Sequence, residues 1–355
     1  MSLLTQAGAY PDRVSDYNGV TSPTPVQFDK RVCSYQEKPC QSRGTCTMKT
    51  PVQIVTVSPE ESGQKLFAFL RARTGQHLPE ALCMRVVRTG QVRIDGRRCK
   101  PFDRVLAGQT VRIPPLEIQN QAGPQKNTTS VSVERVFENS DMIALHKPSG
   151  LPVHGGSGWT DSLRDRLAAL PWPTPFIPVP VHRLDRDTSG IVLCAKTHAC
   201  VRAMHAQWQS VTKAYLCWVQ GVWPWKSWHT LTSLLEKKKT TQGQRMVPGT
   251  GKTAITHVLP VASQADSTLL LVVLGTGRTH QIRVHLAQAG HAIYGDGKYG
   301  TPGSRLLLHA TMLRWPGQSI LCWPDWQAPY TITSALRQRV VHILDSAPTK
   351  EASHV

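Results

Sequence analysis

The passage from a charged loop into an apolar segment at Val181–Cys194 constrains the fold of this chain more than any other stretch. Its sequence is VHRLDRDTSGIVLC, where Asp185 and Asp187 stand among arginines just ahead of the apolar run Ile191–Ala195. A short apolar run that follows polar turn residues is typical of a buried strand. The stretch therefore predicts a carboxylate presented where a strand begins. The two aspartates would share a face in an extended segment, whereas a turn imposes no such relation.

The charge of the chain favours a polyanionic partner. Its 355 residues include 41 lysines and arginines against 23 acidic residues, a formal net charge of +18. Nucleic acid is the first candidate for such a partner and an anionic membrane the second. We find no apolar run of transmembrane length and no secretory signal at the N-terminus. The resulting expectation is a soluble, cytoplasmic protein of about two domains that binds RNA or DNA.

The nine cysteines predict neither disulfides nor a zinc site. Their number is odd, they are scattered in mostly apolar surroundings, and no two are spaced as CxxC. This usage is typical of reduced, buried thiols in a reducing compartment. His280 and His285 are five residues apart, rather than four as in HExxH, so they do not predict a metal pair either. We therefore expect no bound metal.

Taken alone, an Arg-Asp cluster is also typical of a solvated, salt-bridged turn. The full motif is more specific: HRLDRDTSG at His182–Gly190 resembles the HRLD-x-x-TSG signature of the RluA family of pseudouridine synthases. Two further motifs follow in the family's order, K-x-Y at Lys213–Tyr215 and GRTHQIRVH at Gly277–His285. A KPxG-type element, Lys147–Gly150, precedes all three, although these residues are equally typical of an ordinary turn.

The resemblance implies an α+β catalytic domain with a mixed, mostly antiparallel sheet and an RNA cleft across its middle. It also implies the reaction: the N1–C1′ bond of a uridine breaks, the base turns, and a C5–C1′ bond forms, without any cofactor. Asp185 would take the place of the family's catalytic aspartate. The sequence leaves open whether it attacks C1′ or C6, or takes a proton from C2′.

Three more residues receive roles from the resemblance. Arg283 would pair with the catalytic aspartate and keep it ionised in a closed pocket. Tyr215 would contact the target uracil, although a core tyrosine on a strand is the alternative. Arg183 would fill the space vacated by the flipped uridine or hold the flipped nucleotide. The spacing of GRTHQIRVH also predicts a helix after Gly277, with Thr279 near its N-cap.

The stretch 51–115 predicts a smaller α/β module. A strand at 51–58 precedes apolar helical spacing in LFAFLRART and in Pro79–Arg88, a hairpin at Asp95-Gly96 and a strand at Val105–Pro114. Two helices followed by a basic β-turn-β resemble the S4 RNA-binding domain. The resemblance implies a phosphate-contacting surface, and the alternative is a solvated basic face without a partner. The residues expected on this surface are Arg85, Arg88, Arg93, Arg97, Arg98 and Lys100.

The GTGKT sequence at Gly249–Thr253 imitates a phosphate-binding loop. A true loop of this kind needs a glycine five residues before Gly251, where this chain has Met246. The preceding stretch, Glu236–Gly243, is polar rather than an apolar strand. We therefore exclude nucleotide hydrolysis and expect a basic hairpin edge that contacts RNA.

The motifs predict the organisation of the chain. The combination most resembles the branch of the family that acts on large-subunit ribosomal RNA. The predicted parts are an extension without a stable fold at 1–50, with Met48 as a candidate true start, the S4-like domain at 51–115, a linker at 116–130, the catalytic domain at 131–345 and a tail at 346–355.

The predicted function follows from this organisation. We expect a monomeric, cytoplasmic enzyme that converts uridines of 23S ribosomal RNA to pseudouridine, with no cofactor and no membrane partner. A tRNA-directed member of the same family is one alternative. A non-catalytic RNA-binding or ribosome-assembly protein that keeps the fold is the other.

Overall fold

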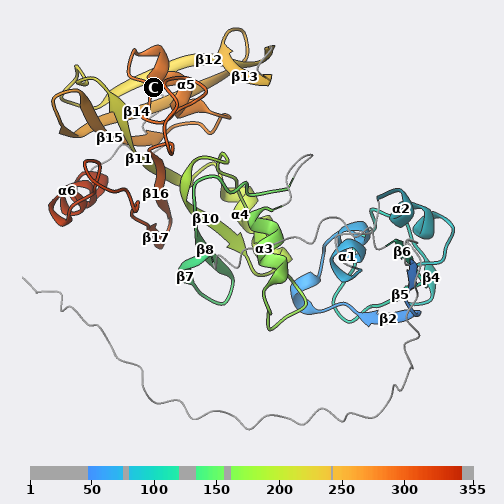
Figure 1. Ribbon diagram of the computed structural model, residues 1–355. Helices are drawn as coiled ribbons and strands as arrows, with labels where there is room; N and C mark the ends of the chain where they lie inside the picture. The colour runs from blue at the N-terminus through green and yellow to red at the C-terminus, as the bar shows by residue number, and fades with distance from the viewer. Residues whose placement is uncertain (1–46, 75–79, 120–132, 156–160, 241–242, 346–355) are drawn as a thin grey trace, which may run out of the picture. The chain divides into compact units, whose positions relative to one another are not determined.

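The computed structural model of the chain is drawn in Figure 1. Residues 1–46, 120–132 and 346–355 lie outside its described part, and with them nearly all of the predicted extension, most of the predicted linker and the predicted tail. Within the described part, no helix combines the length and the apolar composition that crossing a membrane requires. The described residues are 47–74, 80–119, 133–155, 161–240 and 243–345.

The described residues up to 119 form a small α/β unit (Figure 1). Its main elements are β2 (Gln53–Thr56), η1 (Pro59–Glu61), α1 (Leu66–Arg73), α2 (Glu80–Arg88), β3 (Arg93–Ile94), β4 (Arg97–Arg98) and β5 (Thr110–Ile113). The sheet has the order β2-β5-β3-β4, and all neighbouring strands are antiparallel. Both helices bury the apolar positions that helical spacing selects, such as Phe69 on α1 and Val86 on α2, in one common core.

The hairpin predicted at Asp95-Gly96 is confirmed. Asp95 has φ 48° and Gly96 has φ 75°, the left-handed pair that a two-residue hairpin turn requires. Two further short strands, β1 (Thr47–Lys49) and β6 (Glu117–Gln119), pair antiparallel with each other. These two strands flank the predicted module at 51–115, and each satisfies backbone groups of the other.

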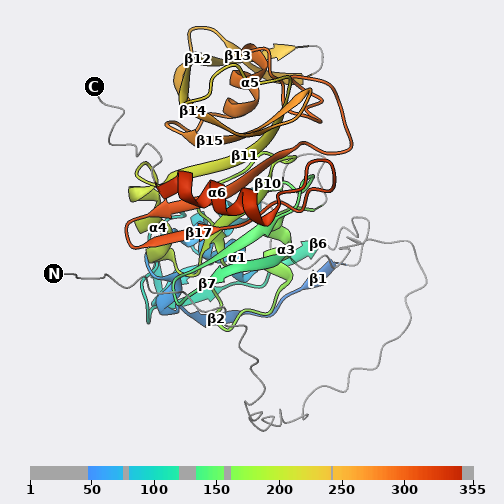
Figure 2. The same cartoon turned by 90° about the vertical axis from the view of Figure 1, so that its left-hand side faces the viewer.

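The described residues from 133 onward contain an eleven-stranded sheet that is mixed and mostly antiparallel, as expected. Its main path is β13-β12-β14-β15-β11-β16-β10-β8-β7, while β17 pairs with β16 and β9 with β10. Figure 2 shows these strands following one another from β7 to β12. The strands are β7 (Glu134–Glu138), β8 (Met142–Lys147), β9 (Val179–Pro180), β10 (Ser189–Ala195), β11 (Thr212–Gln220), β12 (His229–Thr240), β13 (Gly243–Pro248), β14 (Lys252–Ser263), β15 (Ser267–Leu274), β16 (Leu308–Trp315) and β17 (Gln318–Leu321).

β16 joins two halves of this sheet. It lies between β11, with which it is antiparallel, and β10, with which it is parallel. Gly190, the glycine of the TSG motif, stands where β10 meets β16 and has φ 118°. A Cβ atom at this position would lie 2.3 Å from the carbonyl oxygen of Ala310. Only glycine permits this close approach of two backbones.

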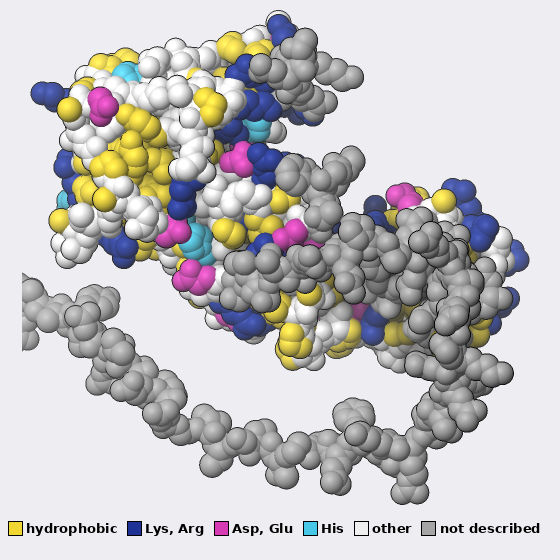
Figure 3. Space-filling view, viewed as in Figure 1, with side chains coloured by type: hydrophobic (Ala, Val, Ile, Leu, Met, Phe, Trp, Pro, Cys, Tyr) yellow, Lys and Arg dark blue, Asp and Glu magenta, His cyan; other side chains and the backbone are white. Residues whose placement is uncertain are grey.

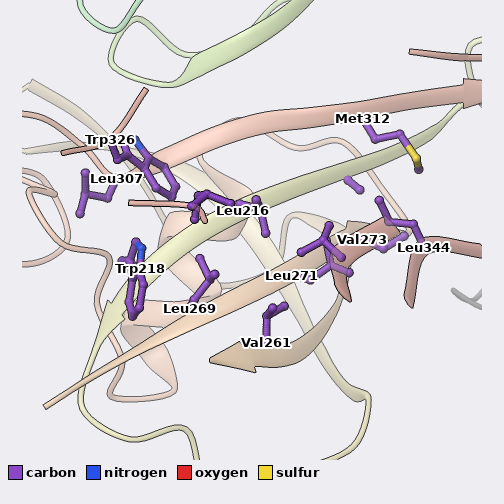
Figure 4. Packing of buried hydrophobic residues seen from close by; sticks show 13 residues of the cluster. Leu216, Trp218, Val261, Leu269, Leu271, Val273, Leu307, Met312, Trp326 and Leu344 are labelled. Atoms are coloured by element: carbon purple, nitrogen blue, oxygen red, sulfur yellow. The ribbon is translucent and has the colours of Figure 1, made fainter. Parts of the chain in front are cut away.

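Alternation along β11 serves two separate cores. Leu216 and Trp218 pack with α6 (Ser334–Asp345) on one face, in the cluster shown in Figure 4. Cys217 and Val219 pack with α5 (Gln281–Gln288) on the other face. Because successive residues of a strand point to opposite faces, one strand supports both helices.

Two helices pack on the other half of the sheet, around β8 and β10. α3 (Leu163–Ala169) buries Leu163 and Leu167 in the cluster that also holds Leu184 of the HRLD motif. α4 (His198–Gln207) buries Met204 against the opposite residues of β10. α4 therefore contributes an apolar residue to the core of this half of the sheet.

Candidate active site

The aspartate of the HRLD motif stands at the start of a tight turn. The backbone N–H of Thr188 donates to the carbonyl oxygen of Asp185 at 3.2 Å, so the segment is a turn and not an extended strand. Asp187 accepts from Arg186 Nε at 2.7 Å and does not border the smaller cavity that Asp185 lines. The two aspartates therefore serve different purposes, and Asp185 keeps a side chain that is 19% exposed.

Residues of the KPxG element hydrogen-bond to the backbone of this turn. Lys147 is fully buried, and its Nζ donates to the carbonyl oxygens of Pro148, Leu151 and Arg186 at 2.8–2.9 Å. The N–H of Gly150 also donates to Arg186 O, at 3.0 Å. The ammonium group thus uses its three donors to join the loop after β8 to the turn before β10.

Arg283 of α5 lies near the Asp185 carboxylate, but it forms its hydrogen bonds with Asp296. Its Nε and Nη2 donate to Asp296 at 2.8 and 2.6 Å, whereas Nη1 lies 3.8 Å from Asp185 Oδ2. Burial opposes ionisation of Asp296, but the hydrogen bonds and charge of Arg283 outweigh it and lower the pKa of this carboxyl group. The expected pairing with Asp185 is therefore a looser contact, secondary to a buried bidentate pair.

α5 begins one residue later than predicted. His280, not Thr279, is its N-cap, with φ 54°. The side chain of Gln281 accepts from the N–H of Arg278 at 2.9 Å and from the hydroxyl of Thr276 at 2.8 Å. These bonds satisfy donors of the loop before the helix and leave the predicted cap, Thr279, exposed.

Four of the residues predicted for the site line one cavity. Asp185, Tyr215, Arg283 and Arg183 all border a space of about 270 Å³ between β11, the Asp185 turn and the start of α5. Burial, with the nearby Asp185 carboxylate, raises the pKa of Tyr215, so its phenol is neutral at physiological pH. A larger, open cleft of about 1500 Å³ shares Asp185, Arg183 and Arg283 with this cavity.

Basic side chains dominate the larger cleft. Figure 3 shows dark blue, cyan and magenta side chains together in the hollow below the part that Figure 1 labels β13. Such a lining is suited to a polyanion with several phosphates. The arginines and lysines that border it are Arg183, Arg186, Lys237, Arg245, Arg283, Lys298 and Arg305.

Comparisons with known proteins show the family of this chain. Residues 141–288 match the family model described as RNA pseudouridylate synthase. A protein of Haemophilus influenzae named ribosomal large subunit pseudouridine synthase C is 38% identical over 75% of this chain and 88% of its own length. This chain belongs to the RNA pseudouridylate synthase family. It is therefore an RNA pseudouridine synthase, an isomerase of uridine in RNA.

Two other relatives, both named ribosomal large subunit pseudouridine synthase C, extend the same finding. The protein of the same name from Escherichia coli strain K12 is 36% identical over 75% of this chain and 89% of its own. The one from Vibrio vulnificus is 32% identical over 85% and 98%. Among solved structures, human RNA pseudouridylate synthase domain containing 1 is 23% identical, with a TM-score of 0.49 over 61% of this chain and 96% of that chain.

The six basic residues predicted for RNA binding lie in the small unit of the synthase, not at the cavity. All six are exposed, and within the described residues none forms an ion pair. Arg98, Arg93 and Arg112 are register partners across β4, β3 and β5, so they form a row on one face of the sheet. Arg112 was not among the predicted residues, because only the pairing of β3 with β5 brings it there. Figure 3 shows dark blue side chains over the part that contains α2 and β4.

The GTGKT sequence at Gly249–Thr253 lies in the turn between β13 and β14 and at the start of β14. β12 and β13 form an antiparallel hairpin, and Gly249 to Gly251 connect β13 to β14. Glu236 accepts from the N–H and the hydroxyl of Thr250 at 3.2 and 3.1 Å, so a carboxylate already occupies these donors. The hairpin contributes Lys237 and Arg245 to the cleft.

Several residues of the site were not predicted from the sequence. His280 was considered only as a metal ligand, yet its Nε2 lies 3.8 Å from Asp185 Oδ2 and its Nδ1 lies 2.8 Å from Tyr299 Oη. Tyr299 and Asp296 belong to the segment after α5, for which no role was predicted. Their signal was present in GDGKYG at Gly295–Gly300, but nothing in the spacing relates it to the aspartate turn.

A separate buried group contains two histidines and a cysteine. The ligand atoms of His146, His309 and Cys322 lie within 4.8 Å of one another. Both ring nitrogens of His309 are already engaged, Nδ1 with Ser189 Oγ at 2.9 Å and Nε2 with the carbonyl oxygen of Cys322 at 3.1 Å. Burial is the main cause that lowers the pKa of His309 to about 3, so this imidazole is neutral and structural.

Proposed function

We propose that this synthase converts uridines of large-subunit ribosomal RNA, 23S ribosomal RNA, to pseudouridine with Asp185 as its catalytic group and without a cofactor. The observation that carries the proposal is the convergence of Asp185, Tyr215, Arg283 and Arg183 on one cavity beside a basic cleft. The names of the relatives from Haemophilus influenzae and Escherichia coli support the choice of RNA.

Each residue of the cavity has a distinct task in this proposal. Asp185 acts on the flipped uridine by attack at C1′ or C6, or by taking the proton of C2′. Arg283 faces it with one N–H group and compensates its negative charge. Tyr215 contacts the uracil as a neutral phenol. Arg183 is exposed at the mouth of the cavity and replaces the uridine in the stack or holds the flipped nucleotide.

The remaining parts of the chain supply affinity for RNA. We assign residues 51–115 to an S4-like RNA-binding domain and residues 131–345 to the catalytic domain. The exposed basic residues of the first, Arg85, Arg88, Arg93, Arg97, Arg98 and Lys100, would contact phosphates without reading bases. We expect the enzyme to act as a monomer in the cytoplasm, where ribosomal RNA is its substrate.

The first prediction concerns the catalytic aspartate. Asp185→Asn should bind RNA as the wild type does but form no pseudouridine, because the amide keeps the size of the side chain and loses its charge. Asp187→Asn is the matched control, since Asp187 pairs with Arg186 and does not border the smaller cavity, and it should keep most of the activity. Turnover by the Asp185 variant within tenfold of the wild type would remove this residue from its role.

The RNA class is tested by mapping pseudouridine in cells with and without the gene. Positions lost from large-subunit ribosomal RNA, and restored by the wild-type gene but not by Asp185→Asn, are the expected result. Losses confined to tRNA would show that the enzyme is a tRNA-directed member of the family. The purified enzyme on ribosomal RNA transcripts then identifies the modified uridines directly.

A further inference from the structure

We propose that Tyr299 and His280 form a hydrogen-bonded pair that positions the catalytic carboxylate. With Arg283, the pair holds one oxygen of Asp185, Oδ2, and leaves the other, Oδ1, for the uridine. The proposal rests on the catalytic role proposed above for Asp185. It adds two positioning residues and assigns the reacting oxygen.

The direction of the hydrogen bonds follows from a backbone group. The N–H of Met246 lies 3.0 Å from Tyr299 Oη and can only donate, so the phenol oxygen is the acceptor there. Burial raises the pKa of Tyr299, so its phenol keeps its proton, and within the described residues His280 Nδ1, at 2.8 Å, is the acceptor in reach of it. A histidine nitrogen that accepts a hydrogen bond carries no proton. The single proton of a neutral His280 ring is therefore on Nε2.

The environment of His280 favours the neutral ring that this arrangement needs. Burial is the largest cause that lowers the pKa of His280, and the cations Arg283 and Lys298 act in the same direction. Asp185 and Asp296 oppose these effects but do not outweigh them. At neutral pH the ring thus presents one N–H donor toward the aspartate turn.

Two donors converge on the same carboxylate oxygen. His280 Nε2 and Arg283 Nη1 each lie 3.8 Å from Asp185 Oδ2. These distances exceed that of a formed hydrogen bond, but catalytic contacts are often long without substrate and shorten when it binds. Within the described residues, the contacts of the Asp185 carboxylate with His280 and Arg283 both go to Oδ2, and Oδ1 accepts no hydrogen bond. Oδ1 is therefore the oxygen available to the sugar or the base.

The backbone at His280 supports a specific role for its ring. Its φ of 54° is a left-handed conformation that costs a non-glycine residue about 1 kcal/mol or more. This conformation carries the ring across the start of α5 toward Asp185. The ring of Tyr299 is held in turn between the guanidinium groups of Arg245 and Arg283, 5.1 and 5.3 Å from its centre. Both members of the pair are thus fixed before RNA arrives.

Four variants separate positioning from simple folding effects. Tyr299→Phe removes the hydroxyl, His280→Asn keeps a residue that tolerates left-handed backbone but removes the distant donor, and His280→Gln restores an N–H near the Nε2 position. Tyr294→Phe is the control, because its hydroxyl donates to Asp266 O outside both cavities. Each is assayed for kcat, KM and melting temperature on the RNA that the wild type modifies.

The expected results differ between kcat and KM. His280→Asn should lower kcat about 100-fold, the effect of a misplaced reacting group, with KM for RNA nearly unchanged. Tyr299→Phe should lower kcat about tenfold, as the loss of one hydrogen bond does. His280→Gln should recover much of the loss, and Tyr294→Phe should match the wild type. Wild-type kcat in His280→Asn, or losses that follow the melting temperature alone, would overturn the proposal.

A measurement without substrate tests the pair independently of the proposed function. Nitrogen-15 NMR of labelled histidines, with the His280 signals assigned from their absence in His280→Asn, reports which ring nitrogen carries the proton. Protonation at Nε2 in the wild type, and a mixture of both forms in Tyr299→Phe, is the expected result. Protonation at Nδ1 in the wild type would refute the pair even if Asp185 is catalytic. Activity in Asp185→Asn would instead refute the proposed function.

Discussion

The guanidinium group of Arg283 contacts two carboxylates, one in the core and one at the site. Nε and Nη2 are committed to Asp296, whose side chain is 1% exposed, and only Nη1 is directed at Asp185. A planar group with donors on two edges can hold one carboxylate through two parallel hydrogen bonds and still direct a further N–H at a second carboxylate, a geometry that the single nitrogen of a lysine does not reproduce. The residue therefore has to be judged by its effect on folding as well as on catalysis.

Replacement of Arg283 by leucine should affect both properties. Arg283→Leu leaves the buried carboxylate of Asp296 without a cation, at a cost of about 3–5 kcal/mol in the free energy of unfolding. Activity should be lost as well. The double variant Arg283→Leu with Asp296→Asn removes the unpaired charge, so it should recover most of the stability but none of the activity. Denaturant titrations and the pseudouridine assay check both, and an unchanged melting temperature and rate in the single variant would contradict the pairing.

His309 should make the fold sensitive to acid. Its pKa of about 3 lies below the ordinary value of 6.5, so the unfolded chain binds the proton first and the free energy of unfolding falls as pH falls below 6.5. From pH 7.5 to pH 5 this single residue should account for about 2 kcal/mol. His309→Gln should be less stable at pH 7.5, since it loses the histidine's hydrogen bonds, but should lose less on acidification. Equal pH dependence in the two proteins would exclude this residue as the cause.

At the scale of elements, the junction of β10 and β16 is the most restrictive point. The Asp185 turn leads directly into this junction, so its geometry depends on how closely the two strands meet at Gly190. The loop after β8 fixes the same turn through Lys147. The carboxylate is thus positioned by three elements that are remote from one another in the sequence.

Gly190→Ala tests this junction. The new methyl group would lie 2.3 and 2.5 Å from backbone atoms of Ala310, so the strands must separate, and we expect a loss of at least about 3 kcal/mol in unfolding free energy. Gly277→Ala is the control, because nothing lies within 4 Å of its Cβ position, and it should change stability by no more than about 0.5 kcal/mol. Thermal and denaturant unfolding measure both. Similar stabilities of the two variants would refute the steric account.

For the molecule as a whole, the distribution of charge should determine the affinity for RNA. The small unit has its own hydrophobic core, drawn from residues 57–116, and carries its basic residues on the surface. Exposed arginines that neutralise phosphates contribute affinity that declines with salt.

The hairpin arginines provide the sharpest test. Replacing Arg93, Arg97 and Arg98 by glutamine should make the slope of log K against log salt shallower by about 2, from about 0.7 for each phosphate contact. Turnover on saturating RNA should stay unchanged. The control replaces Lys226, Arg337 and Arg339, which are equally exposed and line neither cavity, and should keep the wild-type slope. Equal slopes in the two variants would show that the hairpin does not contact RNA.

The sequence predicted several local elements of the fold, but not the residues that surround Asp185. Local patterns sufficed for α2, the Asp95-Gly96 hairpin and the strand after the HRLD motif, because spacing and turn chemistry act over a few residues. The neighbours of Asp185 did not follow from such patterns. Asp296 and Tyr299 lie more than 100 residues after Asp185 along the chain. Only tertiary packing brings them, through Arg283 and His280, to its carboxylate.

The central place of β16 has a consequence for how the protein is made. During synthesis β7 to β15 leave the ribosome first, as two separate sets of paired strands, and β16 must then be inserted between β10 and β11. Until residue 315 has emerged, β11 lacks its partner along one edge and Ser189 and Gly190 of β10 lack theirs, and unpaired edges are surfaces through which chains aggregate. A nascent chain that stops before this point should require chaperones to remain dispersed.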